Sequence, residues 1–180
     1  AGQYTETRLE PANNFKFDLG ELEIPDQTTL VVIVNPNNPN GGTFDMMPLP
    51  DLLVRHPNTC FLVDEAFVGM GGQPVAHLVP HYSNLLVTRT LSKAHSLAGF
   101  RVGYAILPAP LADDLNIHND AYPLARPSQA AAMASLLHEG KIFERVLTLR
   151  EWTRQLAEDL EALGVRTYPT ETYFFLADFA

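Results

Sequence analysis

The sequence has 180 residues, of which 46% are hydrophobic and 18% are charged, and its formal net charge is −9. This is the balance of a globular protein with a core of its own. The negative charge disfavours a nucleic-acid partner, because phosphate backbones attract Lys and Arg. Cys60 is the single cysteine, so no internal disulfide is expected and nothing favours an oxidising compartment. Its apolar neighbours predict a buried core residue.

The longest apolar run is Leu30–Val34, which is far shorter than the ~20 residues that a membrane helix needs. The sequence opens at Ala1 without Met and without a basic segment followed by an apolar one, so no secretory signal is indicated. We therefore expect a cytoplasmic protein that does not bind membranes. The abrupt start indicates a piece of a longer chain, incomplete at both ends.

In chain order, short apolar runs predict strands and the segments between them predict helices. Strands are expected at Leu30–Val34, Cys60–Val63, Leu85–Val87 and Val102–Leu107, and helices at Met47–Arg55, Pro110–Ile117 and Pro127–Leu137. The runs are rich in β-branched residues and the first does not alternate with polar ones, which is typical of strands buried on both faces. The alternation of strands and helices predicts an α/β fold.

The clearest predicted helix is Lys141–Leu163, and Gly164 after it is a good C-terminal stop. Its apolar residues recur every three or four positions and skip Thr153, which predicts a stripe facing the core. The stripe consists of Ile142, Val146, Leu149, Leu156, Leu160 and Leu163. After the helix, Val165–Thr167 and Tyr173–Ala177 predict two more strands.

Polar residues follow three of the predicted strands. The first strand runs into Asn35-Pro-Asn-Asn-Pro-Asn-Gly-Gly42, the second into Asp64-Glu65, and the third into Thr88-Arg-Thr-Leu-Ser-Lys93. In open α/β sheets, ligands bind outside the carboxyl ends of the strands. The three strand ends therefore predict one shared ligand site.

Each candidate residue has an ordinary alternative. Lys93 could reach solvent from a loop, whereas a partly buried lysine has a lowered pKa and acts as a Schiff-base nucleophile. Asp64 could pair with a cation, or bind metal as in a P-loop ATPase, although the glycine-rich phosphate motif of that class does not occur in these 180 residues. Asn38 lies in a run whose composition suits a simple turn.

Two further groups of residues bear on the ligand. Arg101 begins an apolar strand, where an arginine indicates an anion such as phosphate, and Thr90 and Ser92 offer hydroxyl donors to the same anion. His77 and His81 have the spacing of metal ligands on a helix, but Pro80 lies between them and a third ligand is not evident, so no metal site is expected. His95 is expected to stack or pack near the site.

The order of these motifs resembles that of the pyridoxal 5'-phosphate (PLP)-dependent aminotransferases of fold type I (class I/II), and most closely that of histidinol-phosphate aminotransferases. The resemblance rests on Asn35-Pro-Asn-Asn-Pro-Asn-Gly41, Val63-Asp-Glu-Ala-Phe67, Arg89-Thr-Leu-Ser-Lys-Ala-His-Ser-Leu-Ala-Gly-Phe-Arg101 and Tyr122-Pro-Leu-x-x-Pro127, and it runs from about Val31 to the end. It implies a three-layer α/β sandwich with a mostly parallel sheet. Residues 1–140 would be part of the PLP-binding large domain, and residues 141–180 the linking helix and the beginning of a smaller α+β C-terminal domain.

The resemblance also implies a role for each candidate. Lys93 matches the Schiff-base lysine, and Asp64 the carboxylate that pairs with the pyridine nitrogen. Asn38 matches the asparagine that hydrogen-bonds the phenolic oxygen of the ring. Arg101 matches the arginine on the cofactor phosphate, and Thr90 and Ser92 assist it. The implied activity is transfer of an amino group from a small-molecule donor to an oxo acceptor in amino-acid biosynthesis, by a homodimer.

The chain departs from the family pattern at Phe67, where many relatives have a tyrosine that hydrogen-bonds the phenolic oxygen. Phenylalanine at this position is also found in the related threonine-phosphate decarboxylases, so decarboxylation of a phosphorylated amino acid is an alternative reaction. A second alternative is a PLP-sensing domain of a transcription regulator. None of Arg126, Arg145, Arg150, Arg154 and Arg166 is marked by a motif as the residue that would bind a substrate carboxylate, and no ring-stacking aromatic is identified.

Overall fold

The computed structural model describes residues 3–118, 120 and 122–179. Its helices are α1 (Leu49–Arg55), α2 (Ala109–Asn116), α3 (Arg126–Leu136) and α4 (Glu139–Ala162), and its strands are β1 (Leu30–Val34), β2 (Cys60–Asp64), β3 (Leu85–Thr90), β4 (Gly103–Ile106), β5 (Arg166–Thr167) and β6 (Ala177–Asp178). Four 3-10 helices complete the described elements: η1 (Pro11–Asn13), η2 (Leu19–Glu21), η3 (Ala76–His81) and η4 (Ala98–Phe100). The predicted helices and the first four strands are therefore present, with shifts of one or two residues at most ends.

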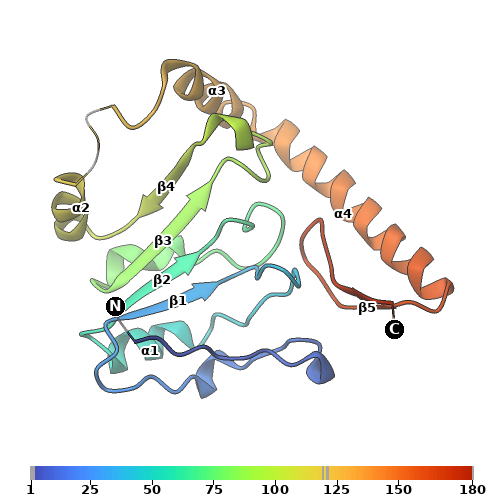
Figure 1. The fold of residues 1–180 in the computed structure, drawn as a ribbon. Helices are drawn as coiled ribbons and strands as arrows, with labels where there is room; N and C mark the ends of the chain where they lie inside the picture. The colour runs from blue at the N-terminus through green and yellow to red at the C-terminus, as the bar shows by residue number, and fades with distance from the viewer. Residues whose placement is uncertain (1–2, 119, 121, 180) are drawn as a thin grey trace.

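The main sheet has the order β1-β2-β3-β4 (Figure 1). β1, β2 and β3 are parallel, while β4 runs antiparallel to β3. β3 continues three residues beyond its predicted end because Thr88, Arg89 and Thr90 pair with β4. The predicted α/β class with a mostly parallel sheet is thus confirmed, and the carboxyl ends of three strands meet at one edge.

One face of the sheet carries the main core. α1, η2 and η3 pack there, and the inward side chains of β1, β2 and β3 meet them. The fully buried residues of this cluster include Phe61, Val63, Leu85 and Val87. A smaller cluster of Leu91, Val102 and Ala132 joins the segment after β3 to α3. The core thus fixes the two central strands, from which the polar strand ends project.

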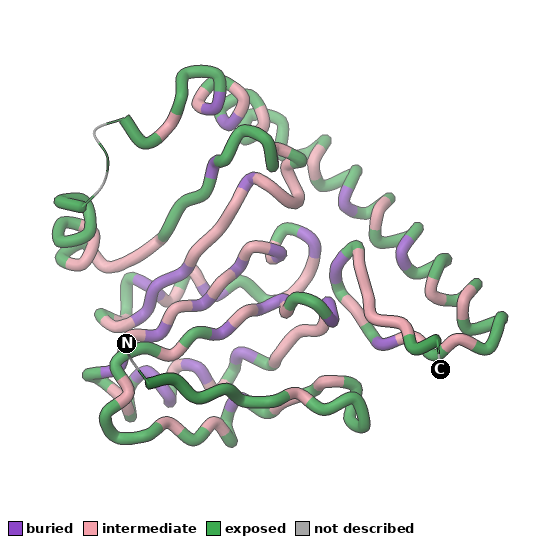
Figure 2. The backbone as a smooth tube through the Cα atoms, in the orientation of Figure 1, coloured by how far each residue is buried: buried purple, intermediate pink, exposed green. Residues whose placement is uncertain are grey.

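The expectation that all four strands are buried on both faces is wrong for β1 and β4 within the described residues. Leu30 and Val32 of β1 are 51% and 56% exposed, and Tyr104 of β4 is 44% exposed. These side chains lie on edge strands, and the described part of the chain supplies no second helical layer over them (Figure 2). Cys60 is likewise half-buried rather than in the core, and burial raises the pKa of its thiol.

The long helix α4 is confirmed, but its predicted buried stripe is only partly right. Val146 is buried as expected, whereas Leu156 and Leu163 are 54% and 79% exposed. Thr153, which the prediction skipped, is 8% exposed, and its hydroxyl donates to the carbonyl of Leu149 at 2.8 Å. That internal hydrogen bond allows a polar residue to lie on the packed face.

The chain ends in a small antiparallel pair, β5 and β6, beside α4 (Figure 1). The strand predicted at Tyr173–Ala177 is wrong except at Ala177, since the pairing involves only Ala177 and Asp178. The residues before it instead contact turns of the main sheet. Within the described ranges, no helix is both long and apolar enough to span a membrane.

Candidate functional site

The candidate site is the edge of the sheet where β1, β2 and β3 end (Figure 1). Backbone hydrogen bonds continue the ladder past the strands: the Asn35 amide donates to the Asp64 carbonyl at 3.0 Å, and the Glu65 amide donates to the Thr88 carbonyl at 2.9 Å. The segments that follow the three strands therefore start side by side. The structure confirms that the three polar strand ends lie on one edge.

Asp64 is the last residue of β2 and is half-buried. Its Oδ1 accepts from the backbone amide of Ala66 at 3.0 Å and from the hydroxyl of Thr88 at 3.3 Å. Thr88 is its register partner on β3. Both hydrogen bonds end on Oδ1, so they fix the direction of the carboxylate at the open edge of the sheet. The second oxygen, Oδ2, takes part in neither of them.

Lys93 follows β3 and is half-buried. Its Nζ lies 5.1 Å from the centroid of the Phe67 ring, within the range of a cation–π contact. Phe67 is only 4% exposed, and the ring of Phe174, from the C-terminal segment, packs edge-on against it at 4.9 Å. The lysine amine is therefore held against an aromatic surface built from two distant parts of the chain.

Thr90 and Ser92 form a compact hydroxyl pair before Lys93. The Thr90 hydroxyl lies 2.9 Å from the Ser92 hydroxyl and 3.2 Å from the Val102 carbonyl, and the Ser92 amide donates to Thr90 Oγ1 at 3.0 Å. Because Val102 directly follows Arg101, this network places the hydroxyl pair next to the arginine segment. The Thr90–Ser92 pair thus lies beside the backbone that carries Arg101.

Arg101 and Asn38 lie at the surface of this edge. Arg101 has a left-handed backbone with φ of 52°, and its Nη1 donates to the Ala98 carbonyl at 3.0 Å. Asn38 precedes Pro39 through a cis peptide bond. Two backbone hydrogen bonds close this turn: the Asn37 amide donates to the Gly42 carbonyl, and the Gly41 amide donates to the Asn37 carbonyl. The described contacts of Arg101 run to its own turn, so its predicted role and that of Asn38 remain predictions.

A buried ion pair behind the site was not predicted. Glu65 is 1% exposed, and its Oε2 lies 2.7 Å from Arg89 Nη2 and accepts from Arg89 Nε at 2.8 Å. Burial tends to lower the pKa of Arg89, but the hydrogen bonds and charges of Glu65 and Tyr104 outweigh burial and raise this pKa above its usual value. A sequence signal existed, since Arg89 closely follows one apolar run and two acidic residues follow the neighbouring one.

The C-terminal segment 170–174 also contributes to the site and was not predicted to do so. Glu171 accepts from the Gly72 amide at 2.9 Å and from the Thr43 hydroxyl at 3.0 Å. Its own amide donates to the Gly41 carbonyl at 2.9 Å. These residues are about a hundred positions or more apart in sequence, so no local pattern could have indicated the contact.

His95 packs near the site as expected. Its Nδ1 lies 2.8 Å from the Ser135 hydroxyl of α3. Burial lowers the pKa of His95, and the charge of Glu139 opposes this shift in part. His77 and His81 are exposed on η3, and no group of three or more His, Cys, Asp or Glu side chains with a metal-binding arrangement is found in the described residues.

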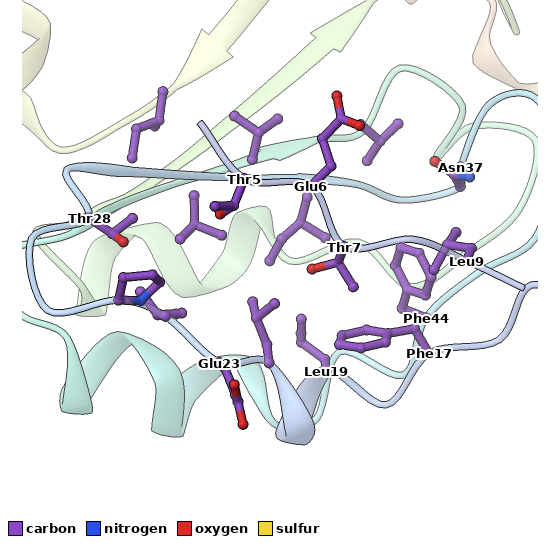
Figure 3. A pocket seen from close by; sticks show the side chains of 18 residues that line it. Thr5, Glu6, Thr7, Leu9, Phe17, Leu19, Glu23, Thr28, Asn37 and Phe44 are labelled. Carbon is purple, nitrogen blue, oxygen red and sulfur yellow. The ribbon is translucent and has the colours of Figure 1, made fainter. Parts of the chain in front are cut away.

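Two cavities lie away from Lys93. One, of about 360 Å³, lies between the N-terminal segment and β1; Thr5, Leu9, Phe17, Leu19 and Phe44 are among its lining residues (Figure 3). The other, of about 550 Å³, lies between α4 and the residues near β5, including Arg154 and Tyr168. Neither is lined by Asp64, Lys93 or Arg101, so the candidate site is an edge of the sheet rather than one of these cavities.

Comparison with known proteins agrees with this geometry. The family "Aminotransferase class I and II" matches residues 2–179. Histidinol-phosphate aminotransferase 2 of Thiobacillus denitrificans is 40% identical over 82% of this chain and 42% of its own length. Histidinol-phosphate aminotransferase of a Marinomonas strain is 37% identical over 98% of this chain and 51% of its own length. The chain therefore spans about half the length of these curated relatives.

Solved structures share the fold. L-threonine-O-3-phosphate decarboxylase from Porphyromonas gingivalis has a TM-score of 0.79 at 24% identity, covering 89% of this chain and 50% of that one. Histidinol-phosphate aminotransferase from Sinorhizobium meliloti, in complex with pyridoxal-5'-phosphate, has a TM-score of 0.73 at 24% identity, covering 79% and 40%. With a family match along nearly its whole length, the chain belongs to the aminotransferases of class I and II.

Proposed function

We propose that the protein is a PLP-dependent aminotransferase that moves an amino group from a small-molecule amino donor to an oxo acceptor. The observation that carries the proposal is Lys93 at the carboxyl end of β3, held against Phe67 on the sheet edge that also presents Asp64. A primary amine can bond to the aldehyde of PLP, and a carboxylate at the same strand edge can pair with its pyridine nitrogen. Family membership supports the same reaction.

The residues present fit this cofactor in their chemistry. The aldehyde requires an amine, which Lys93 supplies. A protonated pyridine nitrogen requires a carboxylate, which Asp64 supplies through the oxygen not engaged by Ala66 and Thr88. A phosphate requires cationic and hydroxyl donors, and the segment that joins Thr90, Ser92 and Arg101 offers both kinds.

Each side chain has a task in transamination. When bound, PLP supplies a ring that withdraws electrons from the substrate's α-carbon. The negative charge of Asp64 keeps the ring nitrogen protonated. The amine of Lys93 would carry a proton to and from the substrate's α-carbon. Arg101 and the hydroxyls of Thr90 and Ser92 would hold the phosphate, and Asn38 would donate to the phenolic oxygen.

We further propose a histidinol-phosphate aminotransferase-like reaction in amino-acid biosynthesis, because the first curated relatives carry that name. The proposal extends to a cytoplasmic homodimer.

We also propose that the chain divides into two parts. Residues 1–140 would be part of the PLP-binding large domain, and residues 141–180 would be the linking helix and the beginning of the small domain. α4 supports this division, because it leads away from the sheet before the chain returns to contact it (Figure 1).

A second candidate reaction is decarboxylation of a phosphorylated amino acid. Phe67 favours it, because the resemblance places phenylalanine rather than tyrosine at this position in threonine-phosphate decarboxylases. Product analysis separates the two reactions: an oxo product formed with conversion of the acceptor supports transamination. Release of carbon dioxide without any oxo product supports the decarboxylase.

The test of the main proposal is borohydride trapping in the full-length protein. With PLP added, we expect a yellow protein whose reduced cofactor stays attached to Lys93 in peptide mass mapping. K93A should lose the label, whereas K141A, which changes an exposed lysine of α4, should keep it. Absence of label in the wild type, or label retained in K93A, would contradict the proposal.

A further inference from the structure

The buried carboxylate of Glu65 is not used by the proposed chemistry, yet it lies directly after Asp64. Its two oxygens have separate partners: Oε2 faces the guanidinium of Arg89 at 2.7 and 2.8 Å, and Oε1 accepts from the Val75 amide at 2.5 Å. A buried charge is tolerated only when it is paired and hydrogen-bonded. Glu65 meets both conditions, so its position is tightly determined.

Glu65 and Arg89 lie behind the site rather than in it. Neighbouring residues of extended chain point to opposite faces of a sheet, so Glu65 and Arg89 point away from the face that Asp64 and Thr88 share. The Glu65 amide also donates to the Thr88 carbonyl at 2.9 Å. Arg89 is in turn the register partner of Tyr104 on β4, so the ion pair connects the ends of β2, β3 and β4.

Glu65 also closes the loop of residues 66–75. Its backbone begins this loop on the sheet, and its side chain holds the far end through the Val75 amide. The loop carries Phe67, whose ring faces Lys93 Nζ. It also brings Gly69 so close to Ala94 that an added Cβ would lie 2.8 Å from the Ala94 Cβ. The loop therefore packs along the Lys93 segment.

We propose that Glu65, held by Arg89, is a positioning residue for Lys93. By fixing both ends of loop 66–75, it holds Phe67 against the lysine and so keeps the amine where the cofactor aldehyde must meet it. The inference rests on the proposed PLP function. It assigns Glu65 no contact with the cofactor or with the substrate.

The test follows covalent attachment of PLP to Lys93 in the full-length apoprotein, without measuring turnover. E65Q keeps an acceptor for the Val75 amide but removes the charge that Arg89 requires. We expect the rate of attachment to fall at least about tenfold, because small displacements of a reacting group cost one to two orders of magnitude in rate. The pH midpoint of the absorbance of the attached cofactor should shift as well.

L53A is the matched control, since Leu53 is 1% exposed in the main core and belongs to α1 rather than to loop 66–75 or the Glu65–Arg89 ion pair. L53A should lower the urea midpoint of unfolding. Its rate of PLP attachment should stay within about twofold of the wild-type rate, and its pH midpoint should match that of the wild type. If E65Q does not fold, R89K carries the same test, because it keeps the charge but loses the two-point contact. The inference about Glu65 would be overturned, with the proposed function left intact, if the folded variant attached PLP at the wild-type rate and with the wild-type pH midpoint. The same would follow if L53A lost as much of the attachment rate as the variant does. A wild type that is never trapped at Lys93 would overturn the proposed function and this inference with it.

Discussion

Gly41 offers a direct test of the contact between the C-terminal segment and the asparagine-rich turn. Its φ is +73°, a left-handed conformation that residues with a Cβ rarely adopt. An added Cβ would lie 2.0 Å from Thr170 Oγ1, 2.6 Å from the Phe174 carbonyl and 2.7 Å from Thr172 Oγ1. G41A therefore adds two penalties, one from the backbone and one from the collision.

The two penalties are of similar size. A left-handed residue with a Cβ costs about 1–2 kcal/mol. Forcing a methyl group into a packed contact costs about 1–3 kcal/mol more, and Thr172, at 2% exposed, has little room to move. Gly164 provides the matched control: its φ is +83°, but an added Cβ meets nothing within 4 Å. We expect G41A to lose about 2–5 kcal/mol, and G164A only about 1–2 kcal/mol.

The assay is urea denaturation of the full-length protein for the wild type and both variants, with the PLP dissociation constant measured alongside. G41A should also weaken PLP binding, because the turn that carries Asn38 must shift to relieve the collision. G164A should bind PLP as the wild type does. Equal stability losses in the two variants would refute the claim that segment 170–174 packs tightly on this turn.

Asp64, Arg101 and His95 each allow a further test. D64N should keep PLP bound but reduce transamination by about a hundredfold in single-turnover kinetics; activity near the wild-type level would refute the role of the Asp64 charge. R101Q should raise the PLP dissociation constant about tenfold by removing a charged phosphate donor, and an unchanged constant in an absorbance titration would count against that role. Because burial lowers the pKa of His95 from 6.5, the unfolded chain binds more protons just below pH 6.5. The free energy of unfolding should therefore fall as the pH falls through this window, and H95N should remove that part of the slope in urea titrations; an unchanged slope would contradict it.

The elements of the fold were predictable where a pattern is local. Short apolar runs identified β1 to β4, and the three- and four-residue spacing of apolar residues identified α4. The error at Thr153 has a physical cause. Positions seven apart differ by only about 20° around a helix, so Thr153 shares the buried side of Val146, while Leu156 does not. Selecting apolar residues alone missed this, because a threonine can satisfy its hydroxyl within its own helix.

The candidate site was predictable to the extent that it follows strand ends. Asp64 ends a parallel strand, and Asn38 and Lys93 come shortly after two others, so topology alone brings their segments to one edge. The contact of Phe174 with Phe67 was not predictable, because it joins residues that lie far apart in the sequence. The strand expected before Ala177 failed for a related reason, since the Phe174 ring packs on Phe67 and the Phe174 carbonyl accepts from the hydroxyls of Thr170 and Thr172.

The two acidic residues at the end of β2 show what motif order leaves out. Asp64 and Glu65 are adjacent in sequence, but the alternation of an extended chain sends their carboxylates to opposite faces. Asp64 is directed by one amide and one hydroxyl at the open edge, while Glu65 is buried against Arg89. Charge alone would have made them equivalent candidates for the cofactor. Their burial and their hydrogen-bond partners distinguish the two residues. Asp64, at the open edge, can meet a ligand. Glu65 is buried, so it can act only through the loop and the strands that it holds.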